Sequence, residues 1–177
     1  MLRLIVGELE PDNGRIKQGS RVKIGYFSQH HDELNGYNNV LVEITDNYGV
    51  SDEQARNYLG AFLFKGDDVY KIVADLSGGE KSRLSLVKFL VDPPNLLLMD
   101  EPTTHLDLLS VEALVQALKH YEGTLVFISH DVHFIRSLAE KTLHVNRGTI
   151  TTYAGGYDYY LEKSGILDDE KGGITAE

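Results

Sequence analysis

The chain lacks cysteine, long hydrophobic runs and an excess of basic residues. Without cysteine it can form neither disulfide bonds nor thiolate metal sites. No apolar run approaches the roughly 18 residues that cross a bilayer, and no signal-peptide pattern opens the chain. Internal repeats and low-complexity segments are also absent. These absences predict a cytoplasmic globular protein that does not enter a membrane.

Basic residues number 17 against 27 acidic ones, which gives a formal net charge of −10. Nucleic-acid binding normally depends on a basic surface, because phosphate contacts dominate its affinity. The charge therefore argues against broad nucleic-acid binding by this chain alone, although a local basic patch stays compatible with it. With 177 residues, of which 42% are hydrophobic and 25% charged, the chain is long enough for one folded domain with a small subdomain.

The stretch Leu96–Asp107 reads LLLMDEPTTHLD. Apolar residues that run into two carboxylates, Asp100 and Glu101, are typical of a parallel strand buried on both faces. Ligands bind at the carboxyl ends of such strands, where paired carboxylates can bind metal and activate water in phosphoryl transfer. A buried strand that ends in an ordinary surface turn accounts for the same residues.

Hydrophobic periodicity predicts an α/β fold. Two capping-box pairs, Ser51 with Gln54 and Ser77 with Glu80, are expected to open helices. Residues 32–75 show no strand pattern, which predicts a helical insertion with a loop at Gly66–Asp68. Strands are expected at Val22–Ser28, Leu96–Met99, Thr124–Ile128, Thr142–Val145 and Thr149–Tyr153, and helices near Leu2–Leu9, Val40–Ile44, Ala55–Phe62, Ser77–Val91, Leu108–Tyr121, Phe134–Leu138 and Tyr157–Leu161.

Several motifs follow one another in a fixed order along the chain. They are Gln29 after the first strand, LSGGE at Leu76–Glu80, Asp100-Glu101 after the central strand and His130 after the next one. In this order the chain resembles the ATP-binding-cassette ATPases, from Leu2 to about Lys163. LSGGE matches the family's signature sequence, LLLMDEP its Walker B strand with the adjoining glutamate, and Leu106-Asp107 its D-loop. Gln29 matches the Q-loop glutamine and His130 the switch histidine.

The sequences DEPTTHLD, SHDVHFI and YAGGYDYYLEK resemble the ABC-F subgroup, although Thr104 stands where that subgroup usually has Asn. ABC-F proteins have two tandem cassettes and no transmembrane domain, and many act on the ribosome in translation. The subgroup's interdomain arm is not found here, so the chain is most similar to the second cassette.

The resemblance implies a P-loop NTPase-like core with a largely parallel sheet, a helical subdomain and an antiparallel C-terminal hairpin. It makes residues 1–165 a partial ABC ATPase domain, with residues 33–92 as the helical subdomain and residues 166–177 as a disordered tail.

The resemblance also implies roles toward ATP and Mg²⁺. Asp100 and Gln29 would hold Mg²⁺. Glu101 would polarise the attacking water, with His130 at the γ-phosphate and Gln29 helping to place metal and water. A second, facing cassette would bind a different nucleotide, and the residues assigned to binding nucleotide are Ser77, Gly78, Gly79, Glu80 and Asp107.

A complete cassette also needs a phosphate-binding loop, G-x-x-x-x-G-K-[ST]. The 17 glycines of this chain include no Gly-Lys pair, and Lys81-Ser82 lies within the predicted signature helix. In the family the helix near Leu2 follows this loop directly, so we expect a fragment that lacks the loop and the N-terminal strands. Because positioning and charge stabilisation supply most of phosphoryl-transfer catalysis, we expect little or no ATPase activity from the isolated chain.

Other functions stay open at this point. The chain could be a non-catalytic module that donates its signature in trans, or a transporter nucleotide-binding domain, although transporters more often carry Ser-Ala-Leu-Asp at the D-loop. Chromosome-organising ATPases have a similar C-terminal lobe, but it follows a coiled coil, and no heptad run precedes this one. His130 and His133 could share a metal. The tyrosines could stack on bases, although packing explains them more simply; they are Tyr153, Tyr157, Tyr159 and Tyr160.

Overall fold

The computed structural model describes residues 1–28 and 34–165 of the chain. The chain divides into two compact units, Met1–Ser129 and His130–Glu177, and each unit has a β-sheet of its own. The expected Q-loop residue Gln29 and the expected tail, residues 166–177, lie outside the described residues.

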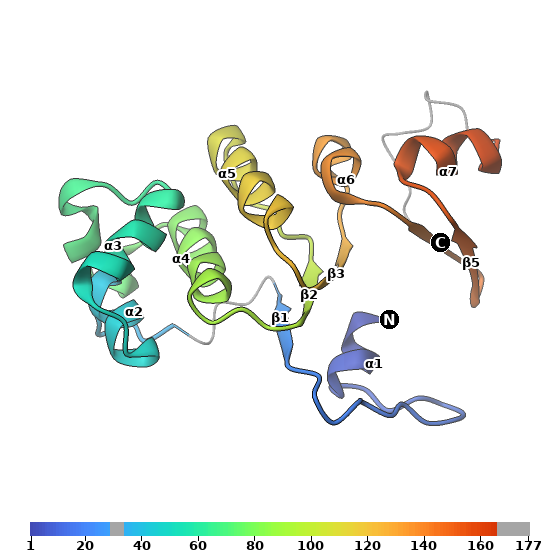
Figure 1. The fold of residues 1–177 in the computed structure, drawn as a ribbon, viewed down its shortest axis with the longest axis horizontal. Helices are drawn as coiled ribbons and strands as arrows, with labels where there is room; N and C mark the ends of the chain where they lie inside the picture. Colours follow the sequence, from blue (N-terminus) through green and yellow to red (C-terminus); the bar gives the residue numbers. More distant parts are fainter. Residues whose placement is uncertain (29–33, 166–177) are drawn as a thin grey trace. The chain divides into compact units, whose positions relative to one another are not determined.

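A three-stranded parallel sheet organises the first unit (Figure 1). Its strands are β1 (Ile24–Phe27), β2 (Leu96–Asp100) and β3 (Thr124–Ile128), with β2 in the middle. Leu97, Leu98 and Met99 of β2 are at most 1% exposed. The apolar run before the carboxylates is therefore a strand with both edges paired and both faces covered, as predicted.

Helix α1 (Leu2–Val6) is shorter than the helical spacing up to Leu9 suggests. Gly7 ends it with a φ of +82°, a left-handed conformation that glycine adopts without a steric penalty. The N–H groups of Glu8 and Leu9 both turn back to the carbonyl of Arg3. Leu9 therefore lies outside the helix and is 50% exposed.

The elements between β1 and β2 are all helical within the described residues, as the sequence predicted. They are α2 (Val40–Tyr48), α3 (Asp52–Ala61), the 3₁₀ helices η1 (Gly66–Tyr70) and η2 (Val73–Asp75), and α4 (Gly78–Val91). Ser51 caps α3 in the predicted capping box with Gln54. The prediction of a loop at Gly66–Asp68 is wrong, because these residues begin η1. There the Asp68 carboxylate accepts a hydrogen bond from the N–H of Lys65.

Helix α4 links this helical segment to the sheet. It contacts α2 and α3 as well as β1 and α5 (Leu108–Lys119) (Figure 1). Near its C-terminal end, Phe89 packs edge-on against Phe27 of β1. Gly25 allows this approach, because a Cβ there would lie 2.7 Å from Pro94 and 2.9 Å from Phe89. The helix that follows LSGGE is therefore packed directly on the sheet.

The second unit contains the predicted antiparallel hairpin, β4 (Thr142–Asn146) and β5 (Thr149–Tyr153), with helices α6 (Val132–Leu138) and α7 (Tyr157–Ser164). Arg147 and Gly148 have φ values of +46° and +76°, as a type I′ hairpin turn requires. Tyr157 and Tyr160 are buried, and the Tyr160 ring contacts Tyr153 edge-on. Packing within this unit accounts for these tyrosines.

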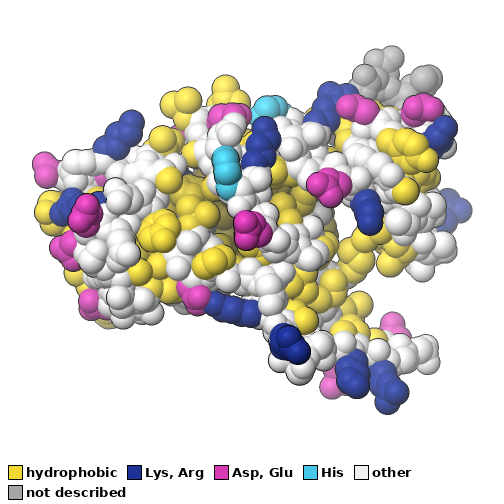
Figure 2. All heavy atoms as spheres, in the orientation of Figure 1, with side chains coloured by type: hydrophobic (Ala, Val, Ile, Leu, Met, Phe, Trp, Pro, Cys, Tyr) yellow, Lys and Arg dark blue, Asp and Glu magenta, His cyan; other side chains and the backbone are white. Residues whose placement is uncertain are grey.

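No helix in residues 1–28 and 34–165 is both long and apolar enough to span a membrane. Hydrophobic side chains that reach the surface lie among charged ones on the face in view (Figure 2). The first turn of α5 provides two of the most exposed, Leu108 at 79% and Leu109 at 71%.

We predict that Leu98→Ala lowers the free energy of unfolding by about 2–5 kcal/mol, because it leaves a cavity in the middle of the central strand. Leu108→Ala makes the same chemical change at a side chain that is 79% exposed, and it should cost less than about 0.5 kcal/mol. Urea unfolding of both variants measures the difference. Equal losses would contradict the central position of β2.

Candidate functional site

Asp100 and Glu101 lie at the carboxyl end of the middle strand. Asp100 is the last residue of β2 and pairs with Ile128 of β3. The N–H of Glu101 donates to the carbonyl of Ile128 at 2.9 Å, so the pairing continues one residue beyond the strand. Both side chains are half-buried. They lie at the carboxyl ends of the parallel strands, which is where α/β proteins bind ligands.

Residues Glu101–Asp107, here named the carboxylate loop, connect β2 to α5. Glu101 and His105 have φ values of +49° and +68°, a left-handed conformation that costs non-glycine residues about 1–3 kcal/mol each. Hydrogen bonds within the loop hold it: Thr104 N–H donates to Glu101 O, and Leu106 N–H donates to Thr103 O, both at 3.1 Å. The Thr103 hydroxyl also lies 3.4 Å from that of Ser129. The loop is a strained turn fixed by its surroundings.

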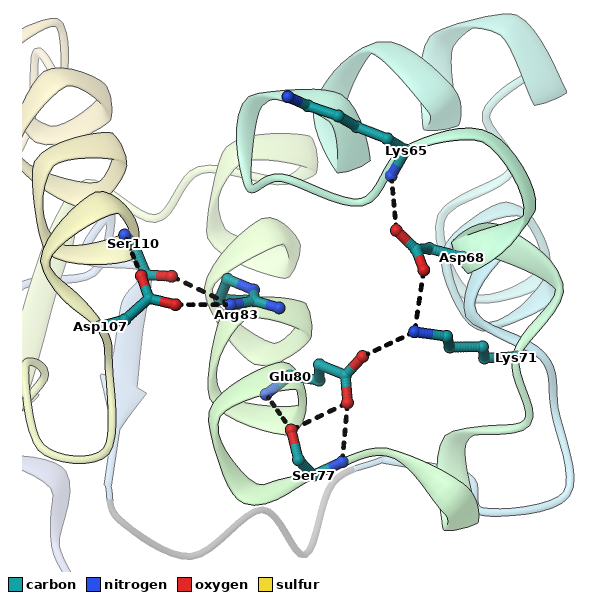
Figure 3. A network of polar contacts seen from close by, with 8 residues as sticks. All are labelled: Lys65, Asp68, Lys71, Ser77, Glu80, Arg83, Asp107 and Ser110. Carbon is teal, nitrogen blue, oxygen red and sulfur yellow. Dashed lines mark hydrogen bonds and ion pairs between the residues drawn. The ribbon is translucent and has the colours of Figure 1, made fainter.

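The first turn of α4 begins with the predicted capping box (Figure 3). The Glu80 N–H donates to the Ser77 hydroxyl oxygen at 3.3 Å. The Ser77 N–H and hydroxyl in turn donate to Oε2 of Glu80 at 2.9 and 2.8 Å. Hydrogen bonding from the Ser77 backbone is the main cause that lowers the pKa of Glu80 to about 2, and the Lys71 ammonium contributes. Ser77 and Gly78 are exposed.

The first turn of α4 lies directly against the carboxylate loop. A Cβ on Gly79 would come within 2.8 Å of the backbone carbonyl oxygen of His105, so only glycine fits without a shift. One turn further along α4, the Arg83 guanidinium donates to the Ser110 hydroxyl at 3.0 Å and lies 3.6 Å from Asp107 Oδ2. The structure thus brings LSGGE and DEPTTHLD together within the first unit.

Asp107 caps helix α5 through its side chain. Its Oδ1 accepts the N–H of Ser110 at 2.8 Å. Hydrogen bonds from Ser110 lower the pKa of Asp107, and the charge of Arg83 adds to the effect. The carboxylate nevertheless stays 62% exposed. Its backbone position is fixed while one side of the group remains open to a ligand.

Sequence reasoning did not select Arg83 or Lys71. Arg83 is three residues after Glu80, which places both on neighbouring positions of one helix face, but nothing in the sequence pairs it with Asp107. Its side chain is 16% exposed and its guanidinium lies over the Phe64 ring at 5.6 Å. Lys71 comes from the segment between η1 and η2, and its contact with Glu80 has no sequence signal.

Two other predicted site residues lie outside the described part of the first unit. His130 is the first residue of the second unit, where it is exposed and precedes Asp131, the residue that caps α6. Gln29 lies outside the described residues. The roles expected of both residues stay predictions.

A family model described as ABC transporter matches residues 1–104 of the chain. The ATP-binding protein YdiF of Bacillus subtilis is 48% identical over 164 residues, which are 92% of this chain and 26% of that protein. The ATP-binding cassette sub-family F member 3 of Mus musculus is 39% identical over 162 residues, 90% of this chain and 23% of that protein. The chain spans about a quarter of the length of these relatives.

Solved structures share the fold. A dimeric ATP-binding cassette in a post-hydrolysis state, bound to ADP and Pi, gives a TM-score of 0.62 at 23% identity, over 76% of this chain and 63% of that chain. An archaeal ribosome recycling factor in complex with the archaeal ribosomal stalk protein gives 0.67 at 24% identity, over 88% of this chain and 30% of that chain. At this identity the likeness shows the fold alone.

We predict opposite effects for two glycines in the first turn of α4. Gly79→Ala forces a Cβ against the His105 carbonyl oxygen, 2.8 Å away, and should lower the free energy of unfolding by about 1–3 kcal/mol. Gly78→Ala meets no atom within 4 Å and should be neutral or stabilise by up to about 1 kcal/mol. Urea denaturation compares the two. Equal unfolding free energies would mean that α4 can move away from the loop at no cost.

The lowered pKa of Glu80 predicts a pH dependence of stability. Ionised Glu80 stabilises the folded chain above its ordinary pKa of 4.5, and this contribution is lost as the pH falls toward 2. In urea unfolding from pH 7 to pH 2, Glu80→Gln should therefore reduce the loss of stability between about pH 5 and pH 2. Glu122→Gln, at an exposed position, is the control. An unchanged acid profile in Glu80→Gln would contradict the capping geometry.

Proposed function

The chain belongs to the ABC transporter family, as an ABC-F ATPase cassette, and from this premise we propose that its first unit contributes to two ATP sites. One site is its own, at the carboxyl end of β2. The other belongs to a facing cassette, whose nucleotide would meet the first turn of α4. The observation that carries the proposal is the direct contact of the first two turns of α4 with the carboxylate loop, through Gly79 and Arg83.

The exposed start of α4 suits a phosphate group. Helix N-termini present free N–H groups and a partial positive charge, both of which favour anions. Ser77 adds a hydroxyl, and Gly78 leaves the backbone exposed, with no atom within 4 Å of where its Cβ would lie. Asp107, 62% exposed next to this turn, is the D-loop residue that would lie at the same nucleotide. Ser77–Glu80 and Asp107 are therefore the proposed contacts with the facing cassette's ATP.

The described residues suit Mg²⁺ only together with a nucleotide. They contain no group of three or more His, Asp or Glu side chains that could hold a metal ion. Mg²⁺ in nucleotide sites needs only one or two carboxylates, because phosphate oxygens and water complete its shell. Asp100, at the strand end, is the proposed ligand, with Gln29 as the family resemblance implies. When bound, Mg²⁺ would neutralise charge on the phosphates.

Glu101 is the proposed residue that orients and polarises the attacking water. Its N–H is bonded to the Ile128 carbonyl, and its φ is +49°. The backbone at the carboxyl end of β2 therefore sets the direction in which its side chain leaves the chain. His130 is proposed to contact the γ-phosphate, and Gln29 to help place metal and water. These two assignments rest on the family resemblance.

The 177-residue polypeptide contains no G-x-x-x-x-G-K-[ST] sequence. We propose that a phosphate-binding loop outside these residues completes its own ATP site, and that the polypeptide alone hydrolyses little or no ATP. The alternative, a non-catalytic module that donates only its signature in trans, uses the same exposed turn at Ser77. The cellular process we propose is translation on the ribosome, alongside a second cassette, as in the ABC-F subgroup.

An ATP turnover assay on the purified 177-residue chain, alone and mixed with a complete ABC-F cassette, tests the proposal. The chain alone should not exceed background, because positioning of the phosphates is lost. With the complete cassette and MgATP, it should associate in an ATP-dependent manner. Glu101→Gln is the control for turnover by this chain.

Turnover by the chain alone that Glu101→Gln abolishes would contradict the need for an external phosphate-binding loop. Absence of ATP-dependent association would contradict the signature role of Ser77–Glu80. Turnover in the mixture that depends on Glu101 would favour an ATPase over a module that only donates its signature.

A further inference from the structure

We propose that Lys71 is a positioning residue for the phosphate-facing turn, because it compensates the charge that Glu80 brings beside Ser77. The inference rests on the proposed function, in which this turn receives the triphosphate of a facing cassette. Lys71 is assigned no direct contact with the nucleotide: it acts through Glu80.

Glu80 creates an electrostatic conflict in the first turn of α4. Its carboxylate stabilises the helix start by accepting both donors of Ser77 and by facing the positive end of the helix. The same negative charge repels a phosphate group that approaches Ser77. The Ser77 hydroxyl also donates its proton to Glu80 at 2.8 Å, so a phosphate oxygen must compete with the carboxylate for that proton.

Lys71 meets the other oxygen of the same carboxylate (Figure 3). Its ammonium lies 3.0 Å from Oε1 of Glu80 and 2.8 Å from Oδ1 of Asp68. The Glu80 side chain is 21% exposed, so this contact is only partly screened by water. A cation on Oε1 withdraws charge from Oε2 and weakens its hold on the Ser77 hydroxyl. Lys71 therefore reduces the repulsion between Glu80 and a phosphate group. It also makes it easier for the Ser77 hydroxyl to donate its hydrogen bond to a phosphate oxygen instead of Glu80.

The main chain holds Lys71 in place from outside α4. Its carbonyl accepts the N–H of Val40 at 3.0 Å, and its own N–H donates to the Asp68 carbonyl at 3.2 Å. Two residues later, the N–H of Val73 donates to the carbonyl of Asn38 at 2.9 Å. The ammonium is thus supplied from a fixed segment between η1 and η2.

The nearby cations of α4 have other partners. The Lys81 ammonium donates to the carbonyl of Ala74 at 3.0 Å. Arg83 contacts Ser110 and Asp107. Among the described residues, Lys71 is the cation in contact with Glu80. Lys71 is therefore the residue whose removal should expose the charge of Glu80.

The experiment measures MgATP-dependent association of the full 177-residue chain with a fluorescently labelled complete ABC-F cassette that cannot hydrolyse ATP, by anisotropy. Lys71→Met should weaken the association roughly 3- to 10-fold, the effect of one uncompensated charge near the ligand. Glu80→Gln keeps an oxygen acceptor for Ser77 without the charge, and its affinity is the reference for the double variant. The double variant Lys71→Met/Glu80→Gln should regain the affinity of Glu80→Gln.

Two matched variants control for structure. Lys65→Met removes a lysine near the same network whose backbone N–H, rather than its ammonium, contacts Asp68, and it should leave the association unchanged. Asp68→Asn removes the charge of the other carboxylate that Lys71 contacts and keeps the contact with Glu80. It should not weaken the association. Thermal unfolding of all variants identifies any that do not fold.

Rescue in the double variant separates charge compensation from a structural role, because a structural role of Lys71 would be lost in both backgrounds. Equal weakening of Lys71→Met and the double variant would overturn the inference. Wild-type affinity in Lys71→Met, or weaker association in Asp68→Asn, would also overturn it and leave the proposed function intact. A wild-type chain without MgATP-dependent association would overturn the proposed function and this inference together.

Discussion

The first unit depends on one close approach, between the backbone of α4 at Gly79 and the carbonyl of His105. A Cβ at Gly79 would lie 2.8 Å from that oxygen, so the helix start and the carboxylate loop can meet only because this residue has no side chain. The contact between Arg83 and Asp107 adds a second point one turn away. Through these two contacts, the first turn of α4 and the loop that carries Glu101 are held against each other.

Acidic charge near the first turn of α4 is partly balanced, in a chain of formal net charge −10. Two acidic side chains of this region, Glu80 and Asp107, each have a basic partner and a backbone donor. The Lys71 ammonium forms an ion pair with Glu80, and the Arg83 guanidinium forms one with Asp107. The pKa values of both carboxyls are lowered, so they stay ionised at neutral pH with their charge partly balanced. Under the proposed function, this partial balance would reduce the repulsion of an anionic ligand.

The sequence predicted what depends on local patterns. The apolar run Leu96–Met99, the capping box of Ser77 and Glu80, and the hairpin around Gly148 all follow from neighbouring residues, and all are confirmed. It overestimated α1, because spacing counted Leu9 while Gly7 ends the helix, and it missed η1. The contacts of Lys71 and Arg83 depend on how separate segments pack, which periodicity does not encode. The roles of Gln29 and His130 stay predictions from the family resemblance.

The central position of β2 has a consequence for local opening of the chain. Its amides are bonded within a sheet that pairs it on both sides, so they should exchange with solvent only through large-scale unfolding. The first turn of α4 is exposed at Ser77 and Gly78 and can open by fraying of a single helix end. The strand that ends at Asp100 and the helix start at Ser77 are thus expected to differ in their protection from exchange, because the first opens only with the whole unit and the second can open by itself.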